Sequence, residues 1–254
     1  MTSTGKWLLR PPSDDAPARL FCFPFAGVGA SAIRHWPGRV GDLELCLVQL
    51  PGRENRLREE PYHDFEAFAA DAAEALRPAM DRPYALFGHC MGALLAYALT
   101  VRLDEIGAPL PSRLFVSSSL VPHRGFFGPF HPTMTDDRLA EDLRAIARST
   151  GAEEPLPELL PLAIRVLRND VEMCFGYRPA GPHKLPVPVS TIGWRSDTDV
   201  APDEMHEWRD YADVRHHVLP GDSFTFLTAP PELFDVIARD FADSRSDLDG
   251  GVYA

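Results

Sequence analysis

The chain has 254 residues, 45% of them hydrophobic, which is enough for one large α/β domain or two small ones. Its formal net charge of −12 argues against nucleic acid as a partner, because an acidic surface repels phosphate groups. No apolar run approaches the roughly 18 residues of a membrane span, and residues 1–6 lack the apolar segment of a secretion signal, so we expect no membrane association.

The first third of the chain alternates strand-like apolar runs with one helical pattern. Residues 1–18 are polar and proline-rich, and we expect a flexible lead-in there. Short apolar runs predict strands at Leu20–Phe25 and Leu43–Leu50, and apolar spacing predicts a helix over Phe65–Met80. A third strand is expected at Tyr84–Phe87.

The pattern Gly-x-Cys-x-Gly, at Gly88–Gly92, directly follows the third expected strand. A helix is expected over Met91–Leu103, and a sharp turn between strand and helix is the context of a nucleophile elbow. Glycines allow the backbone segments of such a turn to approach closely. Cys90 stands where a hydrolase elbow usually carries serine, so it is the expected nucleophile, whereas His89 is expected to be structural.

The second half predicts strands at Leu114–Ser118, Pro188–Gly193 and Val214–Leu219 and a closing helix at Pro230–Phe241. Strands that alternate with helices predict an α/β fold, in which a mostly parallel central sheet carries helices on both faces. We expect this core to comprise residues 19–123 and 186–241. The polar, glycine-containing residues 242–254 are expected to form a flexible tail.

An insertion at residues 124–185 separates the fourth and fifth expected strands. Segments beyond the carboxyl end of a strand in such a sheet overhang the active site, so this insertion is predicted to be a helical lid. Phe126, Phe127 and Phe130 at its start, together with Phe25, predict an apolar substrate chamber. The helical segments of the lid are expected at 135–149 and 157–175.

A nucleophile at an elbow requires an oxyanion hole, an acid and a base. The backbone N–H groups of Ala26, in the glycine-containing loop after the first strand, and of Met91 are expected to form the hole. The acid should follow a late strand, and Asp197 is the first candidate there, with Asp199 the alternative.

The base should be a histidine in the loop after the last strand, but that loop contains Ser223 and no histidine. Two histidines, His216 and His217, lie within the strand itself, and adjacent strand residues point to opposite faces. His217 and Asp222 are therefore kept as possible alternative bases.

Four cysteines are widely spaced, with no Cys-x-x-Cys pair. Cys22, Cys46 and Cys174 lie within apolar stretches and are expected to be small buried side chains. We therefore expect no disulfide framework and no metal site, and a cytoplasmic location.

Several motifs together make the chain closely resemble the type II thioesterases of polyketide and nonribosomal peptide assembly lines, which are α/β-hydrolases. The resemblance spans roughly residues 18–241. The matching pieces are Phe21–Gly27 with Trp36-Pro37, Gln49–Glu54 with Arg56, Gly88-His89-x-Met91-Gly92, Val116-Ser117 with Pro122-His123, Leu167-Arg168-x-Asp170 with Tyr177, and Trp208.

The resemblance implies a stand-alone enzyme that removes acyl groups from the phosphopantetheine arm of an acyl or peptidyl carrier protein, which docks near the lid. It implies no metal and no cofactor of its own. It also implies a serine nucleophile, an aspartate matching Asp197, and a histidine in the motif G-[GD]-H-F-F. The sequence departs twice from this pattern, because Cys90 replaces the serine and Ser223 replaces the histidine.

A thiol, with a reference pKa of about 8.5, needs less help from a base than a hydroxyl does. The helix N-terminus at Cys90 predicts a further fall of that pKa. Hydrolysis of the acyl-cysteine is harder, because no histidine activates water. Three interpretations remain open: a thioesterase that acts through Cys90, an acyl shuttle or cyclase on the same carrier-bound substrates, and a catalytically inactive carrier-binding protein.

Overall fold

A seven-stranded, mostly parallel sheet forms the centre of the molecule in the computed structural model, which describes residues 4–125, 128–150 and 154–250. The strand order is β2-β3-β1-β4-β5-β6-β7, and only the pair β2 and β3 is antiparallel. The expected α/β fold is confirmed. The strands are β1 (Ala18–Phe23), β2 (Arg39–Val40), β3 (Leu43–Leu47), β4 (Tyr84–His89), β5 (Arg113–Ser117), β6 (Val189–Trp194) and β7 (Val214–Leu219).

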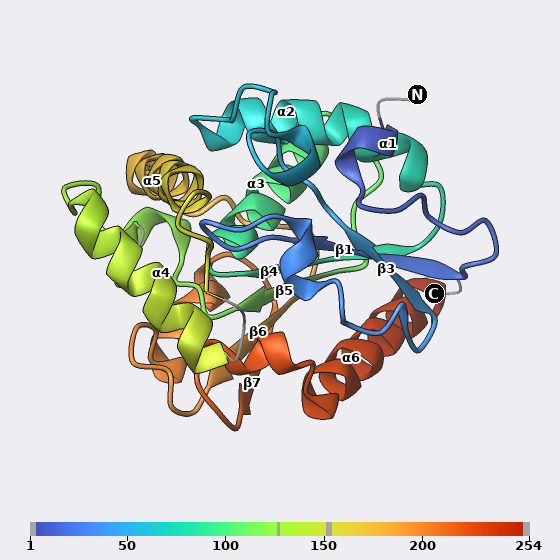
Figure 1. The fold of residues 1–254 in the computed structure, drawn as a ribbon. Coiled ribbons are helices and arrows are strands. Elements are labelled where there is room, and N and C mark those ends of the chain that lie inside the picture. The colour runs from blue at the N-terminus through green and yellow to red at the C-terminus, as the bar shows by residue number, and fades with distance from the viewer. Residues whose placement is uncertain (1–3, 126–127, 151–153, 251–254) are drawn as a thin grey trace.

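Helices cover both faces of this sheet (Figure 1). Helices α2 and α3 pack on one face, where Phe68 and Leu95 are fully buried, and α6 packs on the other face beneath Trp36 and Phe87. The helices are α1 (Thr4–Trp7), α2 (Phe65–Leu76), α3 (Met91–Glu105), α4 (Asp136–Thr150), α5 (Leu160–Gly176) and α6 (Pro231–Gly250). No helix in the described part of the chain is long and apolar enough to cross a membrane.

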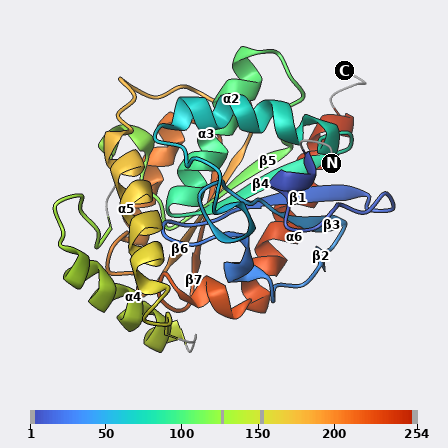
Figure 2. The same cartoon turned by 45° about the horizontal axis from the view of Figure 1, so that its top comes forward.

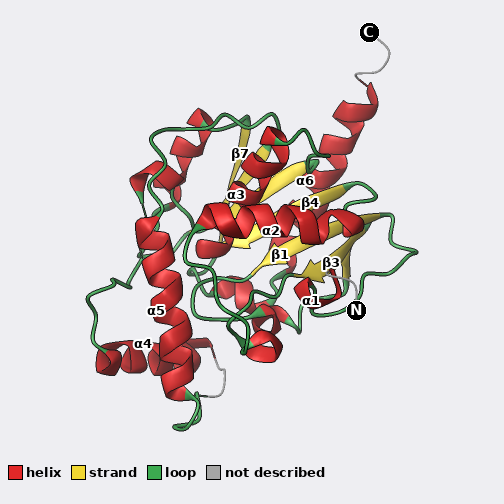
Figure 3. Ribbon diagram, turned by 90° about the horizontal axis from the view of Figure 1, so that it is seen from above, coloured by secondary structure: helices red, strands yellow, loops and turns green. Residues whose placement is uncertain are grey.

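Strand β4 lies in the middle of the sheet and is buried along its whole length. Gly88, near its end, is paired with Phe23 of β1 and with Val116 of β5. The turn that follows β4 is therefore held by strands on both sides. Helices α4 and α5 of the insertion lie together at one side of the sheet, as two further views show (Figures 2 and 3).

Residues near both ends of the described part of the chain are more ordered than we expected. In the lead-in, Trp7 and Leu8 are buried, Leu8 forms an antiparallel bridge with Val48, and Trp7 packs against Phe68. The apolar pair anchors a segment whose composition is otherwise polar, so the expectation of a flexible lead-in is wrong for these residues.

The closing helix does not end at residue 241, and the expectation of a flexible tail from residue 242 is wrong as far as Gly250. The reason lies in polar side chains that face the sheet. Arg113 of β5 donates hydrogen bonds to the Asp240 carbonyl (2.9 Å) and to Ser244 Oγ (2.7 Å), and Ser244 is buried. The polar composition of this segment therefore reflects hydrogen bonds to Arg113 and not exposure to solvent.

Candidate active site

Cys90 occupies a sharp turn between β4 and α3, with the positive backbone angle φ = 52°. A Cβ atom on Gly88 would lie 2.1 Å from the carbonyl carbon of Gly92, and one on Gly92 would lie 2.5 Å from the Phe23 oxygen. Neither position therefore tolerates a side chain. The Cys90 N–H donates to the Ser117 carbonyl (2.9 Å), which ties the turn to β5. These contacts have the geometry of a nucleophile elbow.

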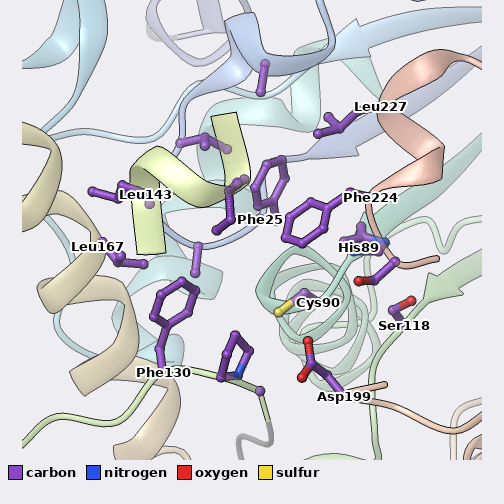
Figure 4. Close-up of a pocket in the computed structure, with 18 of the residues that line it drawn as sticks. Phe25, His89, Cys90, Ser118, Phe130, Leu143, Leu167, Asp199, Phe224 and Leu227 are labelled. Carbon is purple, nitrogen blue, oxygen red and sulfur yellow. The ribbon is translucent and has the colours of Figure 1, made fainter. Parts of the chain in front are cut away.

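The Cys90 side chain faces a cavity of about 340 Å³ with mostly apolar walls (Figure 4). Phe25 and Phe130 line it, as expected, and α4 and α5 contribute Leu143 and Leu167. The lid helices thus form part of the chamber wall. The expected chamber residues Phe126 and Phe127 lie outside the described residues.

Burial raises the pKa of the Cys90 thiol to about 12, and the carboxylates of Asp199, Asp197 and Asp170 raise it in the same direction. The N–H of Met91, at the start of α3, acts against this rise by hydrogen bonding to the sulfur. The prediction that the helix N-terminus would lower this pKa is therefore wrong: desolvation and negative neighbours outweigh the helix end. Thiolate is scarce at neutral pH, so attack by Cys90 needs a base.

Asp197 lies in the chamber wall and is held by three hydrogen bonds. Its Oδ2 accepts from Ser118 Oγ (2.8 Å), and its Oδ1 accepts from the N–H groups of Asp199 (2.9 Å) and Val200 (3.1 Å). An orienting acid of a triad would instead hold the imidazole of the base. Here a serine hydroxyl occupies Oδ2.

Ser223 lines the same chamber as Cys90 and Asp197, so the structure brings these three sequence-predicted residues together. The imidazole among the described lining residues belongs to His89, which stacks on Phe226 with ring centroids 3.9 Å apart. Burial lowers the pKa of His89 to about 3, so the ring is neutral and a weak base. This agrees with the structural role expected for it.

A hydrogen-bond chain behind His89 fixes its tautomer. Trp194 Nε1 donates to Ser117 Oγ (3.0 Å), and Ser117 Oγ lies 3.0 Å from His89 Nδ1. Because Ser117 is fully buried, its hydroxyl proton is assigned to His89 Nδ1, and the ring proton to Nε2.

The two alternative bases lie elsewhere. In the middle of β7, His217 Nε2 lies 2.7 Å from Oδ2 of the buried Asp240 in α6, on the face opposite α2 and α3. Asp222 is exposed, and its Oδ1 accepts from the N–H of Phe224 (3.0 Å) and from Thr225 Oγ1 (3.1 Å). Neither His217 nor Asp222 lines the chamber, so the structure does not support a role for them as bases.

A buried ion pair that sequence reasoning did not assign holds the expected oxyanion loop. Arg53 and Asp170 of α5 form two hydrogen bonds of 2.7 Å, with 5% and 1% of their side chains exposed. Asp170 Oδ2 also accepts from the Gly27 N–H (2.8 Å), and Arg53 donates to the Val28 carbonyl (2.9 Å). The pair therefore fixes the backbone around Ala26, which lines the chamber.

We expect Asp170→Asn to lower the free energy of unfolding by about 3–5 kcal/mol, because the charge of Arg53 stays buried without its partner. Urea-induced unfolding followed by tryptophan fluorescence measures this loss. Asp136→Asn is the matched control: its carboxylate pairs with Arg168 but is 71% exposed, so it should cost less than about 1 kcal/mol. Equal losses in both variants would contradict this account of the loop.

Chemically, the chamber offers a thiol nucleophile, two carboxylates and backbone N–H groups in apolar surroundings. Among the described residues, no group of three or more His, Cys, Asp or Glu side chains is placed to hold a metal ion. The arrangement suits acyl transfer through a covalent intermediate.

Comparison with known proteins agrees with this geometry. The sequence pattern of the thioesterase domain family matches residues 18–241. The chain is 31% identical to "Linear gramicidin dehydrogenase LgrE" of Brevibacillus parabrevis over 92% of both chains. It is 36% identical to the thioesterase RedJ from the prodiginine pathway of Streptomyces coelicolor, with a TM-score of 0.73 and coverage of 94% of this chain and 98% of that one.

A second solved structure, the type II thioesterase YbtT from the yersiniabactin pathway, is 27% identical, has a TM-score of 0.80, and is matched over 93% of this chain and 98% of that one. The covered lengths include the elbow, the lid and the loop with Ser223. The chain therefore belongs to the thioesterase family, as a thioester hydrolase of the type II group associated with nonribosomal peptide and polyketide biosynthesis.

Proposed function

We propose that this enzyme takes acyl groups from the phosphopantetheine arm of an acyl or peptidyl carrier protein onto Cys90 and releases them slowly by hydrolysis. One observation carries the proposal: a cysteine at a nucleophile elbow faces an apolar chamber that Asp197 and Ser223 also line, and Ser223 stands where the family resemblance implies a histidine. The first feature favours attack on a thioester, and the second weakens the release step.

In the first step Cys90 Sγ attacks the thioester carbonyl, and the pantetheine thiol leaves with a proton. The N–H groups of Ala26 and Met91 are proposed to bind the oxyanion. Ala26 lines the chamber, and the Met91 N–H already reaches the sulfur of Cys90. Exchange of one thioester for another is close to thermoneutral, so the acyl group can pass to Cys90 without a large energetic cost.

In the second step water must attack the acyl-cysteine. General base help typically contributes about 10²–10⁴-fold to such a step. The neutral His89, with its lowered pKa, and the hydrogen-bonded Asp197 supply little of it. We therefore propose that the acyl-enzyme accumulates.

A long-lived acyl-cysteine also favours a second candidate, an acyl shuttle or cyclase that passes the group from Cys90 to another thiol, amine or carbanion. The apolar chamber supports this alternative, because it disfavours the water that would otherwise compete.

Intact-mass measurement after mixing with an octanoyl-loaded carrier protein tests these proposals. A mass increase of one octanoyl group on Cys90, followed by slow appearance of octanoic acid, supports the thioesterase. An adduct that disappears only when a second, unloaded carrier protein is added supports the shuttle. Carrier binding with neither adduct nor product indicates a catalytically inactive carrier-binding protein and overturns both.

A further inference from the structure

A second carboxylate, Asp199, lies in the chamber with Cys90 and is used by no step described so far. It lies in the loop after β6, two residues beyond Asp197, and lines the same cavity. Figure 4 shows its carboxylate directed toward the sulfur of Cys90. Of the charged groups that raise the pKa of Cys90, Asp199 has the largest effect, ahead of Asp197 and Asp170.

The two chamber carboxylates differ in what their oxygen atoms already bind. Asp197 accepts three hydrogen bonds, and each of its oxygens has at least one donor. The carboxylate of Asp199 has no hydrogen-bond donor and no ion-pair partner within the residues that the structure describes. Asp199 thus has free lone pairs beside the thiol, and Asp197 does not.

We propose that Asp199 is the general base for Cys90, in place of the histidine that the family resemblance implies at the position of Ser223. The proposal rests on the acyl-enzyme chemistry of Cys90 proposed above. Asp199 becomes a catalytic residue, because its carboxylate would exchange a proton with the reacting sulfur.

The proton balance closes within the chamber. As Cys90 Sγ forms its bond to the thioester carbon, its proton moves to an Asp199 oxygen. When the carbon–sulfur bond to pantetheine breaks, the same proton passes to the departing thiolate. This restores Asp199 as a carboxylate, and the release step stays slow, as proposed above.

The surroundings of Asp199 make it a better base than an ordinary carboxylate. Partial burial and the neighbouring charge of Asp197 raise the pKa of Asp199 above its usual value. The other titratable groups among the described lining residues are His89, which is neutral because its pKa is lowered to about 3, and Cys90, whose pKa is raised to about 12. Neither changes its charge between pH 5 and pH 9.

Asp199→Asn tests the proposal in a direction that a merely electrostatic role would not produce. If Asp199 only repelled the thiolate, its neutralisation would lower the pKa of Cys90 and accelerate acylation. If Asp199 is the base, the substitution should slow acylation by octanoyl-pantetheine by about 10²–10⁴-fold, measured by intact mass. Asp203→Asn is the matched control, since that side chain is 98% exposed and lies outside the chamber, and it should react like the unmodified enzyme.

The unmodified enzyme provides a second measurement that does not depend on a variant. With Asp199 as base, the acylation rate rises with pH as the carboxyl loses its proton and is then level until the thiol begins to ionise. Without a base, only thiolate reacts, and the rate rises tenfold per pH unit up to about pH 12, the pKa of Cys90. A continuous tenfold rise, or an Asp199→Asn variant that reacts as fast as or faster than the unmodified enzyme, would overturn the proposal.

These measurements separate the acylation of Cys90 from the role of Asp199. If the unmodified enzyme never acquires an acyl group on Cys90, the proposed function fails and Asp199 has no substrate step to assist. If Cys90 is acylated normally in Asp199→Asn, the proposed function stands and the base assignment alone is wrong.

Discussion

Cys90→Ala should abolish the acyl-enzyme and reduce thioester turnover by on the order of 10³-fold or more, because no other group in the chamber replaces the attacking sulfur. Intact mass should detect no adduct after exposure to the octanoyl-loaded carrier, and release of free thiol should fall to the uncatalysed rate. Alanine removes only the sulfur and leaves the turn with a Cβ atom, so the fold should be retained.

Cys46→Ala is the matched control for this loss. The Cys46 thiol is also buried, and burial raises its pKa to about 12 as well, but Cys46 lies in β3 and does not line the chamber. The control should keep the adduct and the turnover. Persistence of turnover in Cys90→Ala would show that the nucleophile is another group.

Ser223→His should shorten the lifetime of the acyl-enzyme by about 10²–10⁴-fold, because an imidazole in the chamber that Cys90 and Asp197 also line can activate water. The same ring, once protonated, would stabilise the thiolate and lower the pKa of Cys90 from about 12. Adduct decay followed by mass, and the pH dependence of iodoacetamide alkylation, measure the two effects separately.

The new histidine must compete with Ser118 for Asp197 Oδ2, which the serine hydroxyl now occupies at 2.8 Å. The double variant Ser118→Ala with Ser223→His should therefore shorten the lifetime of the acyl-enzyme more than Ser223→His alone does. Ser196→His is the control, since it adds an imidazole at an exposed position outside the chamber. An adduct that decays equally slowly in Ser223→His and Ser196→His would contradict the missing-base explanation.

Much of the fold could be predicted because the strands β1, β4, β5 and β6 are short, mostly apolar and buried along their whole length. Strand β4 and the elbow followed from a four-residue apolar run and two glycines. The edge strand β2, only two residues long, has no sequence signal of its own. The extension of α6 was also missed, because Asp240 and Ser244 look like solvated residues until Arg113 is placed opposite them.

The composition of the candidate site could be predicted better than its electrostatics. Cys90, Asp197 and Ser223 were predicted from motif positions, and all three line the chamber. The pKa of Cys90 could not be predicted, because it depends on desolvation and on the distance to Asp199, and neither quantity can be read from spacing along the chain. The Arg53–Asp170 pair posed the same difficulty, since 117 positions separate its members.

The packing of the elbow separates the position of the nucleophile from its chemistry. Gly88 and Gly92 fix the turn through contacts with backbone atoms, and none of these contacts involves the sulfur of Cys90. The scaffold determines where a reactive atom stands and is indifferent to whether that atom is oxygen or sulfur. A single substitution can therefore exchange hydroxyl for thiol while the protein stays above its stability threshold, so reaction chemistry can diverge in this lineage without any change of architecture.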